Sequence, residues 1–214
     1  NQPLAAMKTY LAGARLLLQR GRGEEALSSF QRIDDLVERM GAITRQLKSY
    51  ARKGGEAFEP VDLRAALSSA LVMMEPQLRN RTIKLQRNIP RYPVMVYCDR
   101  IRLEQIVINL LRNAVDAIKD VRDPAIEITV SSGSHAFLSV RDNGPGVSDL
   151  ENLFEPFFTT KKPGEGTGLG LAISSGIAAD FGGRLTAHNA SDEGGRGAVF
   201  ELELPLHDPQ RKAG

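Results

Sequence analysis

The chain has few of the features that mark secreted or membrane-spanning proteins. Cys98 is the single cysteine in the 214-residue sequence, so no intrachain disulfide framework can form and a reducing compartment is expected. No apolar run approaches the ~18 residues of a membrane span, and no charged-then-apolar secretion leader is present. The sequence as given therefore predicts a soluble, cytoplasmic piece.

A strong charge of one sign is also missing, since the formal net charge is only +2 at pH 7. Residues 1–53 hold 10 Lys and Arg against 5 Asp and Glu, whereas the remainder holds 18 against 21. This mildly basic first segment favours an acidic protein partner and argues against a nucleic acid. With 42% hydrophobic residues, the chain can bury one full core and a smaller module.

The first fifty residues have helical spacing on both sides of a short glycine-bearing segment, residues 20–23. Apolar positions recur in threes and fours at Leu4, Met7, Leu11, Ala14 and Leu18, and again at Phe30, Ile33, Val37, Met40 and Leu47. This pattern predicts an antiparallel helical hairpin. Leu36, Ile43 and Tyr50 widen the second stripe, so we expect two hairpins to pair into a four-helix homodimer.

Short β-type runs alternating with helices follow the Gly54-Gly55 pair, which we take as a domain boundary. Asp62 and Asp99 are expected to cap helices that run through Leu78 and over residues 100–119. A third helix is expected from Gly168 to Phe181. Strands are expected at 82–89, 94–97, 126–131, 136–141, 184–188 and 198–204. The predicted fold class is α+β: a hairpin over 1–53, a sandwich with a mixed sheet and helices on one face over 54–206, and a tail over 207–214.

A polar stripe crosses the helix predicted at 100–119. Gln105, Asn109, Asn113 and Asp116 recur at spacings of three and four, which places their side chains along one face. Carboxamides in an otherwise apolar helix are costly without partners. The stripe is therefore either a solvated face or a set of oxygen ligands for Mg²⁺ and phosphate.

Glycine-rich segments follow this helix at two places. Asp142 ends an apolar strand and precedes Gly144 and Gly146, which predicts either an ordinary turn or a carboxylate that binds an adenine amino group. The cluster Gly166-Thr167-Gly168-Leu169-Gly170 opens a helix, so it is either a linker or an anion site. Lys161 and Lys162 precede this cluster and could reach a terminal phosphate, or be merely solvated.

Taken together and in order, these motifs resemble the catalytic part of sensor histidine kinases of two-component systems, within the ATPase superfamily shared with gyrase, a class of heat-shock chaperones and mismatch-repair ATPases. The matching blocks are Gln105–Ile118 (QIVINLLRNAVDAI), Asp142–Val147 (DNGPGV), Leu153–Lys161 (LFEPFFTTK) and Gly166–Leu171 (GTGLGL). The resemblance implies a Bergerat-type ATP-binding fold and a transferase that takes part in a phosphorelay.

The resemblance also implies a role for each site residue. Asn113 is expected to bind Mg²⁺, Asn109 to lie near the phosphates as the catalytic residue, and Asp142 to take the adenine amino group. The remaining ATP-binding residues are expected to shape the walls and the lid; they are Gly144, Gly146, Lys161, Gly166, Thr167, Gly168, Leu169 and Gly170. Phe154, Phe157 and Phe158 are expected either to hinge the lid or to be core aromatics.

Two departures from the family pattern refine the prediction. Hydrolysing relatives carry a glutamate at the position of Asn109, and a carboxamide cannot act as that general base. The opening residues Asn1 to Leu4 resemble the end of a His-Glu-(Leu/Ile)-Asn-Gln-Pro-Leu acceptor motif found in dicarboxylate and oxygen sensors. The acceptor histidine is then expected just upstream, and His135, His188 and His207 are interpreted as surface or core residues.

The main hypothesis is thus the cytoplasmic catalytic portion of a sensor histidine kinase, whose parent protein is anchored in the inner membrane. Its expected partners are a second copy, through residues 1–53, and a response-regulator receiver domain; no nucleic acid is expected. The alternative is a nucleotide-binding scaffold or conformational ATPase of the same superfamily without phosphotransfer. A coiled-coil interaction module would explain the hairpin but would leave the four motifs unused.

Overall fold

The computed structural model describes residues 2–34, 37, 58–79, 83–161, 166–190 and 196–207. It divides into two compact units, which are described separately. The first comprises Asn1–Gly55 and Thr159–Leu169, and the second comprises Glu56–Phe158 and Gly170–Gly214.

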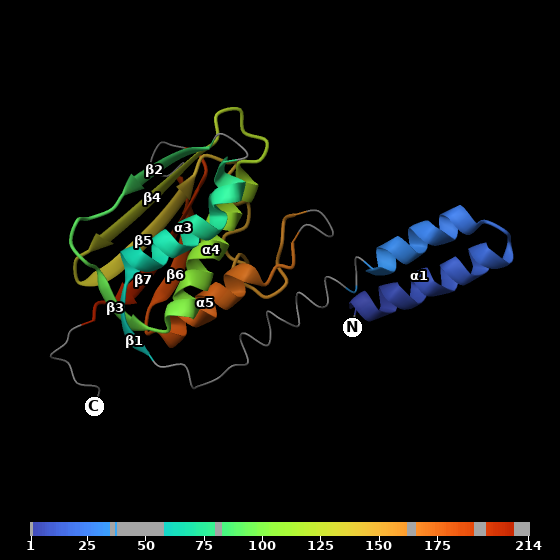
Figure 1. Cartoon of the computed structure of the whole chain (residues 1–214), viewed down its shortest axis with the longest axis horizontal. Coiled ribbons are helices and arrows are strands. Elements are labelled where there is room, and N and C mark those ends of the chain that lie inside the picture. The colour runs from blue at the N-terminus through green and yellow to red at the C-terminus, as the bar shows by residue number, and fades with distance from the viewer. Residues whose placement is uncertain are drawn as a thin grey trace. The chain divides into compact units, whose positions relative to one another are not determined.

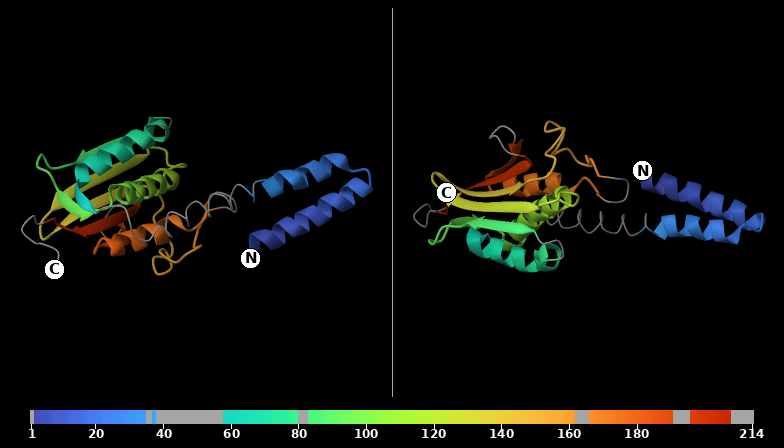
Figure 2. Two further views of the ribbon diagram at one scale, coloured as in Figure 1. Left: turned by 60° about the horizontal axis from the view of Figure 1, so that its bottom comes forward. Right: turned by 90° about the horizontal axis from the view of Figure 1, so that it is seen from above.

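The first unit contains a helical hairpin, whose two helices lie side by side in Figures 1 and 2. Helix α1 spans Gln2–Gln19 and a second helix covers residues 23–34. Gly21 ends α1 with a φ of 73°, and its N–H donates to the Leu18 carbonyl at 3.0 Å. This is the left-handed glycine cap that favours a sharp helix end, and it confirms the predicted turn. The remainder of the predicted second helix lies outside the described residues, apart from Val37.

The side chains of this hairpin differ widely in burial. Ala14 and Ala26 are both fully buried, whereas Leu11 and Leu18 are 56% and 52% exposed. Both leucines are therefore only partly covered within a single hairpin. Tyr10 joins the two helices by accepting a 3.5 Å hydrogen bond from Arg32.

The second unit is built on a five-stranded mixed sheet, as predicted. Its strand order is β2-β4-β5-β7-β6, and β2 runs parallel to β4 whereas every other neighbouring pair is antiparallel. The strands are β2 (Lys84–Asn88), β4 (Ala125–Ser132), β5 (His135–Asp142), β7 (Ala198–Pro205) and β6 (Arg184–Asn189).

Three helices cover one face of this sheet (Figures 1 and 2). They are α3 (Leu63–Arg79), α4 (Arg100–Ala117) and α5 (Gly170–Asp180). Buried side chains alternate along β4 and β5, and α4 buries a stripe that includes Leu103, Ile106 and Leu110. Each such aliphatic side chain stabilises the fold by about 1.5–3 kcal/mol when it leaves water. Asp99 caps α4 as predicted, since its carboxylate accepts the Arg102 N–H at 3.1 Å.

A second, two-stranded sheet was not foreseen. Strand β1 (Glu59–Asp62) pairs antiparallel with β3 (Met95–Cys98). The predicted strand at 94–97 therefore exists, shifted by one residue, but it lies outside the large sheet. The sequence of β1, Glu-Pro-Val-Asp, lacks any alternation of apolar residues, so its strand conformation depends on its partner.

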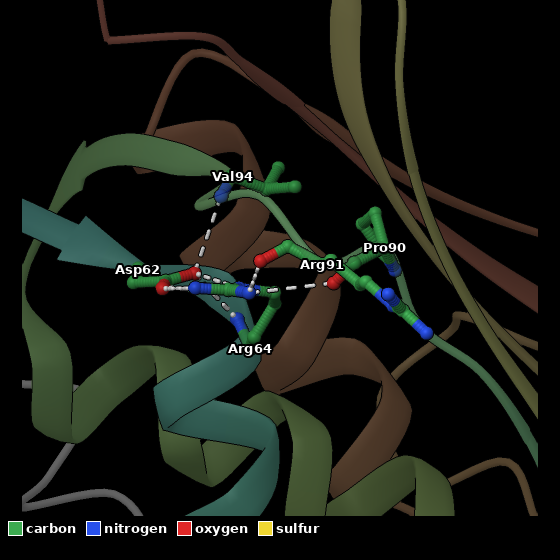
Figure 3. A network of polar contacts seen from close by, with 5 residues as sticks. All are labelled: Asp62, Arg64, Pro90, Arg91 and Val94. Carbon is green, nitrogen blue, oxygen red and sulfur yellow. Dashed lines mark hydrogen bonds and ion pairs between the residues drawn. The ribbon is translucent and has the colours of Figure 1, made fainter.

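Asp62 connects this small sheet to α3. Its carboxylate accepts from the Arg64 N–H at 3.1 Å, as an N-cap does, and from the Val94 N–H at 3.2 Å. The Arg64 guanidinium pairs with the same carboxylate at 2.7 Å and donates to the carbonyls of Pro90 and Arg91 (Figure 3). Because Arg64 hydrogen-bonds the charged form, the pKa of Asp62 is lowered. The network holds the start of α3 to the segment before β3.

Candidate functional site

Asp142 lies at the end of β5 and is 2% exposed. Its Oδ1 atom accepts hydrogen bonds from the backbone N–H of Gly144 at 2.8 Å and of Ala198 at 3.4 Å. Burial raises the pKa of this carboxyl group, and the two N–H donors offset part of that rise. Oδ2 makes no hydrogen bond to any residue that the structure describes. One oxygen is thus fixed by backbone donors, whereas the other has no donor among the described residues.

The glycines around Asp142 are required by close backbone contacts. A Cβ atom on Gly144 would lie 2.8 Å from the Ala117 carbonyl oxygen, at the end of α4. A Cβ atom on Gly197 would lie 1.7 Å from the Asp142 carbonyl oxygen, and Gly197 has a φ of 103°. Only glycine permits both approaches. They bring the ends of α4, β5 and the start of β7 to one place.

The loop after Asp142 is held by a residue from another strand. Asn189, at the end of β6, accepts from the Val147 N–H at 2.7 Å and donates to the Val147 carbonyl at 2.8 Å. Gly146 precedes Val147 with a φ of 84°, and a Cβ atom there would lie 2.7 Å from Asn189 Oδ1. The predicted glycines Gly144 and Gly146 therefore form a tight wall beside Asp142.

The polar stripe of α4 divides into residues with different surroundings. Asn109 is half-buried, and its Nδ2 donates to the Gly170 carbonyl at 3.3 Å and to Ser174 Oγ at 3.1 Å. Asn113 is half-buried, and its side chain makes no hydrogen bond to another described residue. Gln105 and Asp116 both have partners. The stripe is therefore not a uniformly solvated face.

The glycine cluster before α5 belongs to the first unit, apart from Gly170. Within that unit, the Lys161 N–H donates to Thr159 Oγ1 at 3.2 Å and the Leu169 N–H to Thr167 Oγ1 at 3.4 Å. Gly166 lies against Thr159 and Lys161. Gly168 has a φ of 67°, which lies outside the range of a right-handed helix. Helix α5 therefore begins at Gly170 and not at Gly168 as predicted. Lys162 lies outside the described residues.

The phenylalanines before this cluster do not form a buried group. Phe157 is 65% exposed with a φ of 70°, so its interpretation as a core aromatic is wrong. Phe154 and Phe158 are half-buried. None of the three lies in the core because the segment from 151 to 160 has only turns and irregular structure.

Several residues at the site were not expected from the sequence. Ser174, Asn189 and Gly197 contact the predicted residues from α5, β6 and the start of β7. Neither Ser174 nor Asn189 stands in a recognisable motif. Gly197 stands in a glycine-rich segment, Gly194-Gly195-Arg196-Gly197, which was an available signal.

In the part of the chain that the structure describes, no three His, Cys, Asp or Glu side chains gather as a metal-binding group. Among those same residues, no helix combines the length and the apolar content that a bilayer crossing requires.

Comparison with known proteins identifies the family. Residues 98–208 match the model of the histidine kinase-, DNA gyrase B-, and HSP90-like ATPase family. This match contains α4, Asp142 and the glycine cluster, so it covers every predicted site residue.

Individual relatives extend the similarity over nearly the whole chain. The C4-dicarboxylate transport sensor protein DctB of Pseudomonas aeruginosa is 42% identical over 95% of this chain and 34% of its own length. Sensor protein FixL of Bradyrhizobium diazoefficiens is 31% identical over 97% of this chain and 42% of its own. The chain thus spans roughly a third to two fifths of these curated relatives.

A solved structure supports the same assignment. Histidine kinase ThkA in complex with response regulator protein TrrA matches with a TM-score of 0.71 and 25% identity, over 96% of this chain and 60% of that one. The chain therefore belongs to the histidine kinase-, DNA gyrase B- and HSP90-like ATPase family, as the ATP-binding catalytic part of a sensor histidine kinase.

Proposed function

We propose that the protein containing this chain transfers the γ-phosphoryl group of Mg–ATP to a histidine, and from there to an aspartate of a response-regulator receiver domain. The relatives are sensor kinases, and one neighbour in structure was solved with its response regulator. Because the chain spans about a third of its relative DctB, the acceptor and the signal-sensing parts are assigned to the longer protein.

The observation that carries this proposal is the state of Asp142. Its Oδ1 is held by two backbone N–H groups, while Oδ2 has no partner among the described residues. An adenine amino group would donate to Oδ2 and offset the cost of burying the charge, because a buried carboxylate needs donors. Guanine places a carbonyl oxygen at the same position of the ring and would be repelled. Asp142 thus selects adenine over guanine.

The amide side chains of α4 are suited to bind Mg²⁺ and the phosphates of the nucleotide. The half-buried carboxamide of Asn113 has no hydrogen-bond partner among the described residues, and we assign it as a ligand of Mg²⁺. The lack of an acidic cluster among the described residues fits this assignment, because Mg²⁺ commonly takes one or two protein oxygens and completes its shell with phosphates and water. When bound, the ion would neutralise charge on the phosphates.

Asn109 determines what the site does with ATP. A carboxamide cannot remove a proton from water, so the site lacks a general base at the position where hydrolysing relatives have glutamate. We propose that Asn109 lies near the phosphates and that ATP is retained until a nucleophile arrives in line. We assign Gly144 and Gly146 to the wall beside adenine. The residues assigned to the lid, near the phosphates, are Lys161, Gly166, Thr167, Gly168, Leu169 and Gly170.

The histidines of the chain do not suit the acceptor role. His135 lies on β5, where its Nδ1 is 3.4 Å from Glu203 Oε1, and His188 lies on β6. His207 follows β7 and stacks on Tyr97 with ring centroids 5.4 Å apart. None of the three is on the hairpin, so we assign the acceptor histidine to another part of the longer protein.

The hairpin is proposed to pair with that of a second copy. Leu11, Leu18 and Leu27 are all more than half exposed in the single chain. A four-helix bundle would bury such leucines, as coiled-coil packing does. We therefore propose that residues 1–53 form the dimerisation and regulator-docking domain, followed by the ATP-binding domain at 54–206. We further propose a cytoplasmic location for both domains, in a parent protein anchored in the inner membrane.

Two measurements test this function. Calorimetry with the 214-residue chain should show Mg–ATP binding and much weaker binding of Mg–GTP. The longer protein, incubated with ATP labelled at the γ-phosphate, should acquire acid-labile label and pass it to a receiver domain. ATP binding without any label in the longer protein would favour the alternative, a nucleotide-binding scaffold. Absence of ATP binding would reject both.

A further inference from the structure

Ser174 is a buried polar residue that neither caps a helix nor belongs to the site as the sequence defines it. Among the described residues, the buried polar or charged side chains are Asp99, Asp142 and Ser174. Asp99 caps α4 and Asp142 faces the proposed adenine position. Ser174 lies in α5 between the buried residues Ile173 and Ile177, with no exposed surface. A hydroxyl group in such surroundings is costly unless it has a partner.

The partner of Ser174 is the residue assigned to catalysis. Asn109 Nδ2 donates to Ser174 Oγ at 3.1 Å and to the Gly170 carbonyl at 3.3 Å. A primary amide has two protons on nitrogen, so these two acceptors use both of them. Gly170 and Ser174 are four residues apart and therefore lie on the same face of α5. The nitrogen side of the carboxamide is thus fixed against α5.

The contact of Nδ2 with α5 also determines the direction in which the amide oxygen of Asn109 points. With Nδ2 turned toward α5, Oδ1 of Asn109 must point away from these two acceptors. A Cβ atom on Gly170 would lie 3.8 Å from Cγ, Nδ2 and Oδ1 of Asn109 alike, so the flat face of the carboxamide packs against Gly170. If the amide were flipped, its oxygen would face the Gly170 carbonyl, which can only accept, and the two oxygens would repel each other.

We propose that Ser174 is a positioning residue that holds the Asn109 carboxamide in one orientation, with Oδ1 presented to the metal-bridged phosphates. This inference rests on the proposed function. Gly170 is both the first residue of α5 and the last glycine of the lid motif. Asn109 therefore has its orientation set by the segment at which the lid motif ends and α5 begins. Ser174 supplies the acceptor that remains in place inside the helix.

Ser174→Ala removes this acceptor and leaves the rest of α5 unchanged. In the 214-residue chain, the variant should bind Mg²⁺ with a non-hydrolysable ATP analogue roughly threefold to tenfold more weakly, the range for one lost hydrogen bond. Binding of ADP without metal should change by less than about twofold, because adenine contacts are intact. Ser174→Thr retains a hydroxyl group and should restore most of the affinity.

A double-mutant cycle separates positioning from packing. If Ser174 acts through Asn109, Ser174→Ala should have no further effect on metal–nucleotide binding in an Asn109→Ala background. Ile177→Val, which trims another buried side chain of α5 and removes no hydrogen bond, should lower stability and leave affinity unchanged.

Three results would overturn the proposal. The first is equal affinity of wild type and Ser174→Ala for the metal–nucleotide complex. The second is that Ser174→Ala lowers this affinity equally in the presence and absence of the Asn109 side chain. The third is an equal loss of affinity in Ile177→Val. A wild-type chain that binds no Mg–nucleotide would instead reject the proposed function, so the two failures are distinguishable.

Discussion

The carboxamide of Asn189 binds both backbone polar groups of Val147, with hydrogen bonds of 2.7 Å to its N–H and 2.8 Å to its carbonyl. Because the two residues are 42 positions apart in the sequence, this pair ties the loop after β5 to the end of β6. The loop contains Gly144 and Gly146, so the wall beside Asp142 depends on Asn189.

Asn189→Ala should release this loop. We expect the affinity for adenine nucleotides to fall roughly tenfold, since each lost hydrogen bond costs about 0.5–1.5 kcal/mol. Calorimetric titration with ADP measures the effect. Asn88→Ala is the matched control, because Asn88 donates a single exposed hydrogen bond to Glu127. Equal affinity of both variants would show that the loop holds its shape without Asn189.

Asp142→Asn should separate binding from stability. Loss of the charged acceptor should weaken adenine-nucleotide binding by about 1–3 kcal/mol. Without ligand, the same variant should unfold at a higher temperature than wild type at pH 7, because burial of Asp142 raises its pKa. The folded state then binds a proton more tightly than the unfolded state, so ionisation destabilises the fold as pH rises.

The pH dependence checks the sign of this effect. The stability gained by Asp142→Asn should be largest at neutral pH and should disappear as pH falls to or below the ordinary Asp value of 3.8. Thermal melts of both proteins across this range measure it. A variant that melts below wild type at pH 7 would contradict the predicted cost of the buried charge.

Gly144→Ala should destabilise the second unit, because the added Cβ would lie 2.8 Å from the Ala117 carbonyl oxygen and 2.9 Å from Asp142 Oδ1. A backbone oxygen cannot move aside as a flexible side chain can, so we expect a loss of about 1–3 kcal/mol in the free energy of unfolding. Gly133→Ala is the control, since a Cβ there has no neighbour within 4 Å. Denaturant titration of both variants should separate them, and equal midpoints would refute the steric argument.

Asn113→Ala should change how nucleotide binding depends on Mg²⁺. Without the amide oxygen, ATP affinity should respond less to added metal, while binding in EDTA should match wild type. Titrations at several Mg²⁺ concentrations measure this. Arg112→Ala, which alters an exposed neighbour on α4, should retain the wild-type response. A wild-type metal dependence in Asn113→Ala would remove the assigned ligand role.

Sequence patterns were most successful where a local signal exists. Alternating apolar residues identified β4 and β5, and Asp99 marked the start of α4, because a strand face and a helix cap leave their own periodicity or side-chain type. Strand β1 leaves no such signal, and its conformation comes from pairing with β3. The start of α5 was placed two residues early because the left-handed φ of Gly168 cannot be deduced from a run of glycines.

For the site, the sequence by itself determined which chemical groups are present: the Asp142 carboxylate, the amides of α4 and the glycines that permit close approach. Their order along the chain was enough to indicate the family and adenine-nucleotide binding. Tertiary structure alone decided which oxygen of Asp142 remains open and which way the Asn109 amide turns. Those orientations are set by Ala198, Ser174 and Gly170, and hydrogen bonds between residues more than fifty positions apart leave no periodic trace in a sequence.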